Sequence, residues 1–302
     1  MPYILQFLLV VLLAVLACIK VTIQGFASRN HIRTTLDSVW FNALLFTVIT
    51  VFLLILFPMG EINGTLLFYA ALMTLTTVVF QVCYTIALNS GPVSLTVLIG
   101  NFHVLITTTF SCVVLGEKLY LTQMVGIALL VTSMFLGSQS KPDEKKATRR
   151  WLLLTLLCMS CSATFGIGQK LFLATPESKL PNAQATELAV SYALAAVAGF
   201  IIYFINSRRS GEKSPLGLQK PVILYALGIG LSLCVYQRLN VYALSVVEGT
   251  FQFPTYAGLQ SLGMTLVGIV LFKDKLTRRQ QLSVVCGILC VVLMNLRMGP
   301  CI

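Results

Sequence analysis

Long uncharged apolar stretches alternate along the chain with short polar clusters such as 141-KPDEKKATRR-150. A helix needs about 20 mostly apolar residues to cross the bilayer hydrocarbon, where no water satisfies exposed backbone groups. The pattern therefore predicts separate membrane-spanning helices. Ten spans are expected, over residues 3–25, 35–57, 65–88, 92–115, 122–136, 151–173, 186–205, 221–244, 247–271 and 280–295.

The composition agrees with a polytopic membrane protein. Hydrophobic residues make up 57% of the chain, charged residues 10%, and the mean hydropathy is +0.88. A soluble domain would carry about a quarter charged residues. No polar segment is long enough for a separate catalytic domain, and the first apolar stretch has neither a basic leader nor a small-residue cleavage site, so we expect a span rather than a signal peptide.

The net charge of +11 is distributed as a topology signal rather than as a nucleic-acid patch. Positively charged residues are retained on the cytoplasmic side during insertion, which places both termini outside. The odd-numbered loops hold 15 of the 21 Lys and Arg residues, and the even-numbered loops and tails hold 3. The 15 are Arg29, Arg33, Lys141, Lys145, Lys146, Arg149, Arg150, Arg208, Arg209, Lys213, Lys220, Lys273, Lys275, Arg278 and Arg279, and the 3 are Lys118, Lys179 and Arg297.

The cysteines predict no disulfide framework, because there are nine of them, mostly within predicted spans. Cys158 and Cys161 form a CxxC pair, but in an apolar helix without neighbouring histidine or acidic residues. We therefore expect neither a metal site nor a cofactor.

An internal repeat is visible when 87-ALNSGPVSLTVLIGNFHVLITTTFSCVVLGEKLYLTQ-123 is compared with 243-ALSVVEGTFQFPTYAGLQSLGMTLVGIVLFKDKLTRRQ-280. Both segments run from Ala-Leu through a short loop and a polar-speckled span to an acidic-Lys-Leu turn. Glu117 thus corresponds to Asp274, and Lys20 of the first span corresponds loosely to Lys170 of the sixth. Such self-similarity indicates two copies of one unit.

The expected fold is an all-α polytopic membrane protein of ten transmembrane helices, arranged as two inverted five-helix repeats. The first repeat covers residues 1–138, a charged linker covers 139–150, and the second repeat covers 151–302. Because five is odd, the second repeat enters the membrane in the opposite sense. Inverted repeats are typical of secondary transporters with a binding site at the repeat interface.

The Ile-Lys of the first span, the tight connection between the third and fourth spans, and the turn 115-LGEKLYLTQMVGIALL-130 resemble the EamA-like ten-helix members of the drug/metabolite transporter superfamily. The resemblance covers nearly the whole chain, although each motif is short. It implies alternating access and a cavity lined by the first four helices of each repeat. Such proteins usually have cytoplasmic termini, so either this chain is inverted within the family or the charge rule fails here.

Three basic residues lie inside predicted spans, where a charge costs roughly 2.5–3.5 kcal/mol. Lys20 and Lys170 either reach the interface with their long side chains or face the cavity. Arg238, within a polar cluster, either faces the cavity or pairs with a neighbouring helix. No acidic residue lies deep in a span, so the sequence predicts a net positive cavity.

Polar residues recur at spacings of four and seven in the fourth and ninth spans, which places them on one helix face. They either line a cavity or form interhelical hydrogen bonds, which are worth under about 2 kcal/mol each. His103, within the fourth span, is a proton-relay candidate or a packing residue. The candidate substrate-binding residues are Lys20, Gln81, Tyr84, Asn101, His103, Lys170, Tyr236, Gln237, Arg238, Gln252, Tyr256 and Gln260.

These features favour a secondary transporter of a small anionic or zwitterionic metabolite, not an enzyme. The expected partners are the substrate, the lipid bilayer of the plasma (inner) membrane, and a coupling proton or counter-substrate; no nucleic acid is expected, and the sequence does not indicate an oligomeric state. One alternative is an exporter of cationic or lipophilic drugs, although no membrane-embedded glutamate of the kind used by small members of the superfamily is evident. A membrane enzyme or scaffold is the other alternative, but no catalytic cluster supports it.

Overall fold

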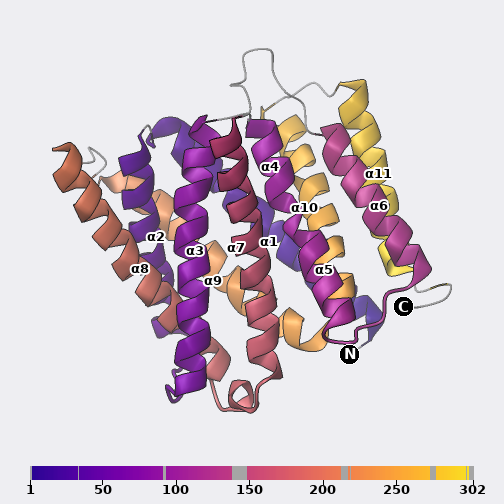
Figure 1. Cartoon of the computed structure of the whole chain (residues 1–302), viewed down its shortest axis with the longest axis horizontal. Coiled ribbons are helices and arrows are strands. Elements are labelled where there is room, and N and C mark those ends of the chain that lie inside the picture. The colour runs from indigo at the N-terminus through magenta and orange to yellow at the C-terminus, as the bar shows by residue number, and fades with distance from the viewer. Residues whose placement is uncertain are drawn as a thin grey trace.

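A computed structural model describes residues 2–32, 34–90, 93–137, 148–211, 217, 219–272, 277–296 and 298 of the 302-residue chain. The described part is helical and forms one bundle, in which the amino terminus and the carboxyl end both lie at the lower edge (Figure 1). The elements are α1 (Tyr3–Asn30), α2 (Thr35–Leu56), α3 (Gly64–Ser90), α4 (Val93–Asn101), α5 (His103–Val113), α6 (Leu121–Gly137), α7 (Arg149–Ala174), the 3-10 turn η1 (Pro176–Lys179), α8 (Ala183–Ser210), α9 (Lys220–Val246), α10 (Gly249–Phe272) and α11 (Arg278–Asn295).

Nine of the ten predicted spans each overlap one helix of the structure, and the fourth overlaps two, α4 and α5. Six described helices are long and apolar enough to cross a membrane, and Leu98–Val113 and Leu121–Gly137 are shorter apolar helical stretches. The largest end errors are at α1 and α8, which continue to Asn30 and Ser210. In α8 the added turn carries Arg208 and Arg209, and cations are favourable at a helix C-terminus.

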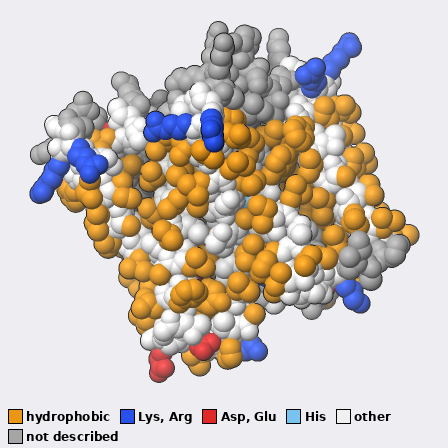
Figure 2. All heavy atoms as spheres, in the orientation of Figure 1, with side chains coloured by type: hydrophobic (Ala, Val, Ile, Leu, Met, Phe, Trp, Pro, Cys, Tyr) orange, Lys and Arg blue, Asp and Glu red, His pale blue; other side chains and the backbone are white. Residues whose placement is uncertain are grey.

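Apolar side chains cover the outer surface of the bundle, while exposed basic residues gather at one edge (Figure 2). We call this edge the basic rim; its described members are Arg149, Arg150, Arg208, Arg209, Lys220, Arg278 and Arg279. The opposite edge carries Lys118, Lys179 and Glu61 as exposed charges. An apolar belt between two charged edges is the surface that a bilayer-spanning bundle presents.

Helices of the first half pack mainly against helices of the second half. The helix α1 contacts α9 and α10, and α7 correspondingly contacts α3, α4 and α5; likewise, α2 contacts α9, and α8 contacts α3. The same list of pairings results if each helix is replaced by its counterpart in the other half: α1 by α7, α2 by α8, α3 by α9, and α4–α5 by α10, and the reverse. Three further large contacts join such counterparts directly: α2 with α8, α5 with α10, and α6 with α11, whereas α10 also packs against α11 within the second half.

The contact between α2 and α8 requires a small residue at Gly199. A Cβ added to Gly199 would lie 3.0 Å from the Cβ and 3.2 Å from the Cα of Ala43, so the two backbones approach closely. Close approach through small residues is a common way for membrane helices to associate, because van der Waals packing replaces the hydrophobic driving force.

We predict that Gly199→Ala lowers the thermal stability of the detergent-purified protein. The added methyl group meets the α2 backbone, which cannot rotate away as a side chain can, and overpacking typically costs about 1–3 kcal/mol. Gly228→Ala is the matched control, because its Cβ would meet only Ile23 Cδ1 at 3.9 Å. A Gly199→Ala protein at least as heat-resistant as the Gly228→Ala protein would contradict the prediction.

Candidate functional site

A buried ion pair joins the two halves at the end of the bundle opposite the basic rim. Lys170 Nζ of α7 lies 2.5 Å from Glu117 Oε1, in the connection between α5 and α6. The two side chains are 8% and 14% exposed. The charge of Lys170, one of the three basic residues expected within spans, is therefore balanced inside the protein.

Local structure brings Glu117 into this position. Gly116 turns the chain with φ +67°, a conformation that L side chains rarely adopt, and the Glu117 N–H donates to Ser111 O at 3.1 Å. The second carboxylate oxygen accepts the backbone N–H of Thr250 at 3.0 Å, in the first turn of α10. An acid is favourable at a helix N-terminus, where unpaired N–H groups and the helix dipole carry positive charge.

Further hydrogen bonds extend this junction to the connection between α9 and α10. Lys170 Nζ also donates to Val247 O at 3.3 Å, and the Thr250 hydroxyl donates to Lys118 O at 3.0 Å. A Cβ on Gly249 would lie 2.4 Å from Ser111 Oγ and 3.1 Å from Lys170 Cε. The junction therefore joins α5, α7 and α10 with no space left at Gly249.

A chain of three amide side chains lies beside the ion pair. Gln252 Nε2 of α10 donates to Asn240 Oδ1 of α9 at 3.2 Å, and Asn240 Nδ2 donates to Gln169 Oε1 of α7 at 3.1 Å. Gln169 and Gln252 are each 2% exposed. Gln169 is adjacent to Lys170 in sequence, and Gln252 lies two residues after Thr250, so the amide chain adjoins the ion pair at both α7 and α10.

Both ends of the amide chain lack a partner among the described residues: Gln169 Nε2 at one end and Gln252 Oε1 at the other. The hydroxyl of buried Ser111, next to Gly249, also lacks one. An unpaired buried polar group costs about 1–3 kcal/mol, so such groups are usually satisfied by water or a ligand. A donor and an acceptor therefore remain available at opposite ends of the amide chain.

The remaining candidates of α9 and α10 divide between two places. The ring centres of Tyr236 and Tyr256 lie 6.0 Å apart at the contact of these helices. The backbone oxygen of Gln260 accepts the S–H of Cys18 in α1, with 3.7 Å between oxygen and sulfur. Gln237 Nε2 instead donates to Tyr192 OH of α8 at 2.5 Å.

Arg238 also points toward α8, where NH1 donates to Gln184 Oε1 at 3.3 Å. Its guanidinium carbon lies 5.4 Å from the ring centre of Phe57, in the geometry of a cation–π contact. The described contacts of Arg238 thus match the structural pairing that the sequence left open.

The fourth predicted span is broken between α4 and α5, near the middle of its length. His103 Nδ1 bonds Gly100 O at 3.0 Å, and the Phe102 N–H donates to Ile99 O rather than four residues back. Asn101, at the break, is exposed, and His103 is half-buried. Interrupted helices at membrane depth occur where the backbone is buried in protein or lines a cavity.

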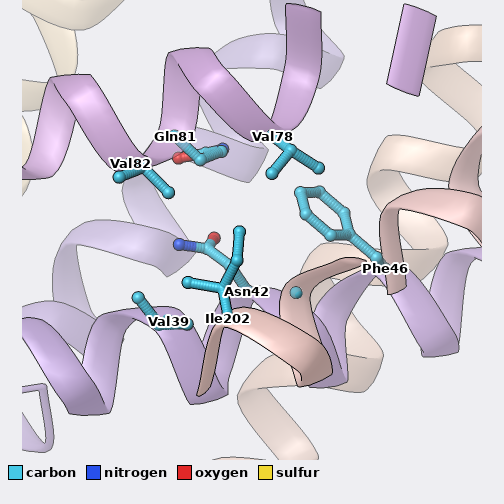
Figure 3. Close-up of a pocket in the computed structure, with 8 residues that line it drawn as sticks. Val39, Asn42, Phe46, Val78, Gln81, Val82 and Ile202 are labelled. Atoms are coloured by element: carbon cyan, nitrogen blue, oxygen red, sulfur yellow. The ribbon is translucent and has the colours of Figure 1, made fainter. Parts of the chain in front are cut away.

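Three candidates lie apart from the ion pair and the amide chain. Tyr84 stacks on Phe80 with ring centres 5.2 Å apart, and half-buried Lys20 lies on α1. Gln81 of α3 instead lines a cavity of about 20 Å³ between α2, α3 and α8, where its amide faces that of Asn42 (Figure 3). Asn42 Oδ1 is buried without a partner among the described residues, and the cavity is large enough for one water molecule.

A larger cavity, of about 420 Å³, lies between α1 and α10. Its lining is almost entirely apolar and includes Val11, Val15, Ile19, Leu259 and Val267. Its size falls within the range of small-molecule pockets.

Sequence reasoning missed Glu117, Gln169 and Asn240 as members of the site. The sequence places Glu117 in a turn outside the membrane and predicts a net positive cavity. In the structure the turn folds inward against α10, and Glu117 neutralises the charge of Lys170. The counterpart Asp274 lies outside the described residues. The sequence offers one signal for Gln169, because this residue directly precedes the candidate Lys170.

Residues 8–138, in the first half of the chain, match the model of the EamA-like transporter family. This part of the chain is therefore similar to that family, which lies within the drug/metabolite transporter superfamily. No curated protein matches the chain. Among solved structures, 28 chains match. One, described only as the crystal structure of a protein, has a TM-score of 0.70 at 12% identity and covers 96% of this chain and 94% of its own, which shows the same fold.

The family match and the apolar helices together indicate a multi-pass membrane protein, and the family consists of transporters of small molecules. The polar groups of the site come from α7, α9 and α10, whereas Glu117 comes from the first half.

We predict that Glu117→Gln costs about 3 kcal/mol or more of stability, because it leaves the Lys170 charge buried and uncompensated. The double variant Glu117→Gln/Lys170→Met should recover most of the loss, since it removes the charge as well. Heating detergent-purified protein and measuring the remaining monodisperse fraction gives the comparison. Glu61→Gln, at an exposed carboxylate, is the control. The prediction is wrong if the double variant is no more stable than Glu117→Gln.

Proposed function

We propose that the protein is a secondary-active transporter of small zwitterionic or anionic organic metabolites, of the amino-acid or carboxylate-bearing kind. The observation that carries the proposal is the amide chain from Gln252 to Gln169, which is open at both ends and adjoins a charge-balanced ion pair. The open donor suits a carboxylate, and the open acceptor suits an ammonium group. Since Glu117 already neutralises Lys170, a zwitterion fits better than a bare anion.

Transport is proposed to proceed by alternating access between two inverted five-helix repeats. The matching turns at Glu117 and Asp274 support this arrangement, and so does the helix contact pattern that survives exchange of the two halves. The ion pair and the Thr250 bonds hold one end of the interface between halves together. In the proposed cycle these bonds separate when that end opens, and the substrate site is then exposed on that side.

A second candidate is export of a lipophilic solute. The apolar cavity of about 420 Å³ between α1 and α10 favours it, because a lipophilic molecule could enter such a cavity from the surrounding hydrocarbon. The two candidates differ in the polarity of the ligand that the folded protein binds.

The transport proposal is tested with detergent-purified protein and then in liposomes. We predict that neutral amino acids raise the melting temperature, because a ligand that binds only the folded state stabilises it. Gln252→Ala should weaken that binding about tenfold, the equivalent of one good hydrogen bond. Gln281→Ala, an exposed glutamine of α11, is the matched control. Counterflow of radiolabelled neutral amino acids in liposomes then measures transport; stabilisation by lipophilic cations alone would favour the second candidate.

We further propose that the basic rim faces the cytoplasm of a plasma (inner) membrane, with both termini outside. Seven of the described basic residues lie at this rim and two at the other edge, in line with retention of positive charge on the cytoplasmic side.

Cysteines introduced singly at Arg209 and Lys179, in a variant without native cysteines, test this orientation. A membrane-impermeant maleimide applied to intact cells should label the cysteine at position 179 and not the one at 209. The reverse result would place the basic rim outside and reject the orientation inferred from charge.

A further inference from the structure

A buried acid on α8 plays no part in the site described above. Glu187 lies in the second turn of this helix, inside the apolar stretch Ala183–Arg209, and is 1% exposed. It is as buried as the core leucine Leu188 beside it. An acidic side chain in such a place is rare in membrane proteins and usually has a function.

The polar surroundings of Glu187 do not include a compensating cation among the described residues. Its side chain contacts Ser191 Oγ at 3.1 Å, and the one described ion pair is Lys170–Glu117. Arg238 of α9 is directed instead to Gln184, one turn earlier on α8. The other titratable groups near this part of α8 are Tyr192 on the same helix, Tyr69 of α3, Glu177 and Lys179 of η1, and Glu61 of the α2–α3 connection.

The hydrogen-bond geometry accommodates a proton on the carboxyl. Ser191 Oγ lies 2.8 Å from the backbone oxygen of Glu187 and 3.1 Å from its Oε1. A hydroxyl has one proton to donate, and the shorter contact is to the backbone oxygen. The second oxygen–oxygen contact is satisfied when the carboxylic acid donates its own proton to Ser191 Oγ.

Electrostatics leads to the same protonation state. An ionised carboxylate away from water needs a cation or several donors, and otherwise it takes up a proton. The N-terminal dipole of α8 favours the anion, but this effect is small beside the loss of hydration. We propose that Glu187 is a proton-binding site that couples proton movement to the transport cycle.

The contacts around Glu187 show how its proton could be released. The neighbouring Thr186 accepts the backbone N–H of Gly60 at 2.7 Å, which ties the start of α8 to the α2–α3 connection of the other half. Thr74 of α3 also donates to Ser191 O at 2.9 Å. Both bonds cross between halves, so separation of the halves at this end admits water to Glu187. A glutamate exposed to water at neutral pH ionises and releases its proton there.

Infrared spectroscopy of the purified protein tests the protonation directly and independently of the proposed substrate. At neutral pH we expect the C=O band of a protonated carboxylic acid in the wild-type protein. Glu187→Gln should remove this band, Ser191→Ala should shift it because the hydrogen bond is lost, and Glu61→Gln should leave it unchanged. A wild-type spectrum without the band, or a band that persists in Glu187→Gln, overturns the proposal.

Coupling rests on the proposed transport function and is measured in liposomes that enclose a pH-sensitive dye. Neutral amino acids added outside should acidify the interior of wild-type liposomes, and Glu187→Gln should reduce this to the rate of protein-free liposomes. Counterflow of the same amino acids should persist in Glu187→Gln, because exchange needs no net proton movement. Acidification retained by Glu187→Gln overturns the coupling; wild-type protein without counterflow instead contradicts the proposed function.

Discussion

The structure depends on one electrostatic constraint. A charge inside the bilayer is not hydrated, so it needs a partner inside the protein. Lys170 meets this requirement through Glu117, which also accepts the backbone N–H of Thr250 in the first turn of α10. Removing one member leaves the other without compensation, at a cost of several kcal/mol. Because the partners come from the two halves of the chain, Lys170 is neutralised only while the halves are in contact at this end. The same helices, α7 and α10, carry the amides of Gln169 and Gln252.

The mutual packing of the two halves extends this dependence to the whole bundle. The helices of each half are buried mainly by the other half: α2 lies on α8, α5 on α10 and α6 on α11. Because lipid is as apolar as the helices, burial of apolar surface does not drive their association. Close van der Waals packing at small residues, such as Gly199 beside Ala43, contributes instead. In the proposed alternating-access cycle, the bonds that Glu117 and Thr186 make between the halves would have to break and form again.

Hydropathy predicted the helices well, because the requirement for about 20 apolar residues is local and strong. The inverted repeat stays a prediction from the matching segments, and the sequence left open whether Lys170 reaches the interface or faces the protein interior. The role of Glu117 could not be anticipated, because its turn is polar in sequence and is buried only through contact with α10, some 130 residues later. Arg238 shows another limit: its polar neighbours in sequence left open a cavity or a pairing with another helix, and its contacts Gln184 and Phe57 lie far away in sequence. Side-chain partners between distant helices depend on helix rotation, which periodicity leaves open.

The packing of each half against the other also has a consequence during synthesis. A ribosome adds about 5–20 residues per second, and the partner of α6, which ends at Gly137, begins only at Arg278. The first half therefore waits in the membrane for roughly ten to thirty seconds with its packing faces turned to lipid and Glu117 without Thr250. Tertiary folding cannot follow the emergence of the helices one by one and must occur after the chain is nearly complete. For that interval, the surfaces that the second half later occupies are without their partners.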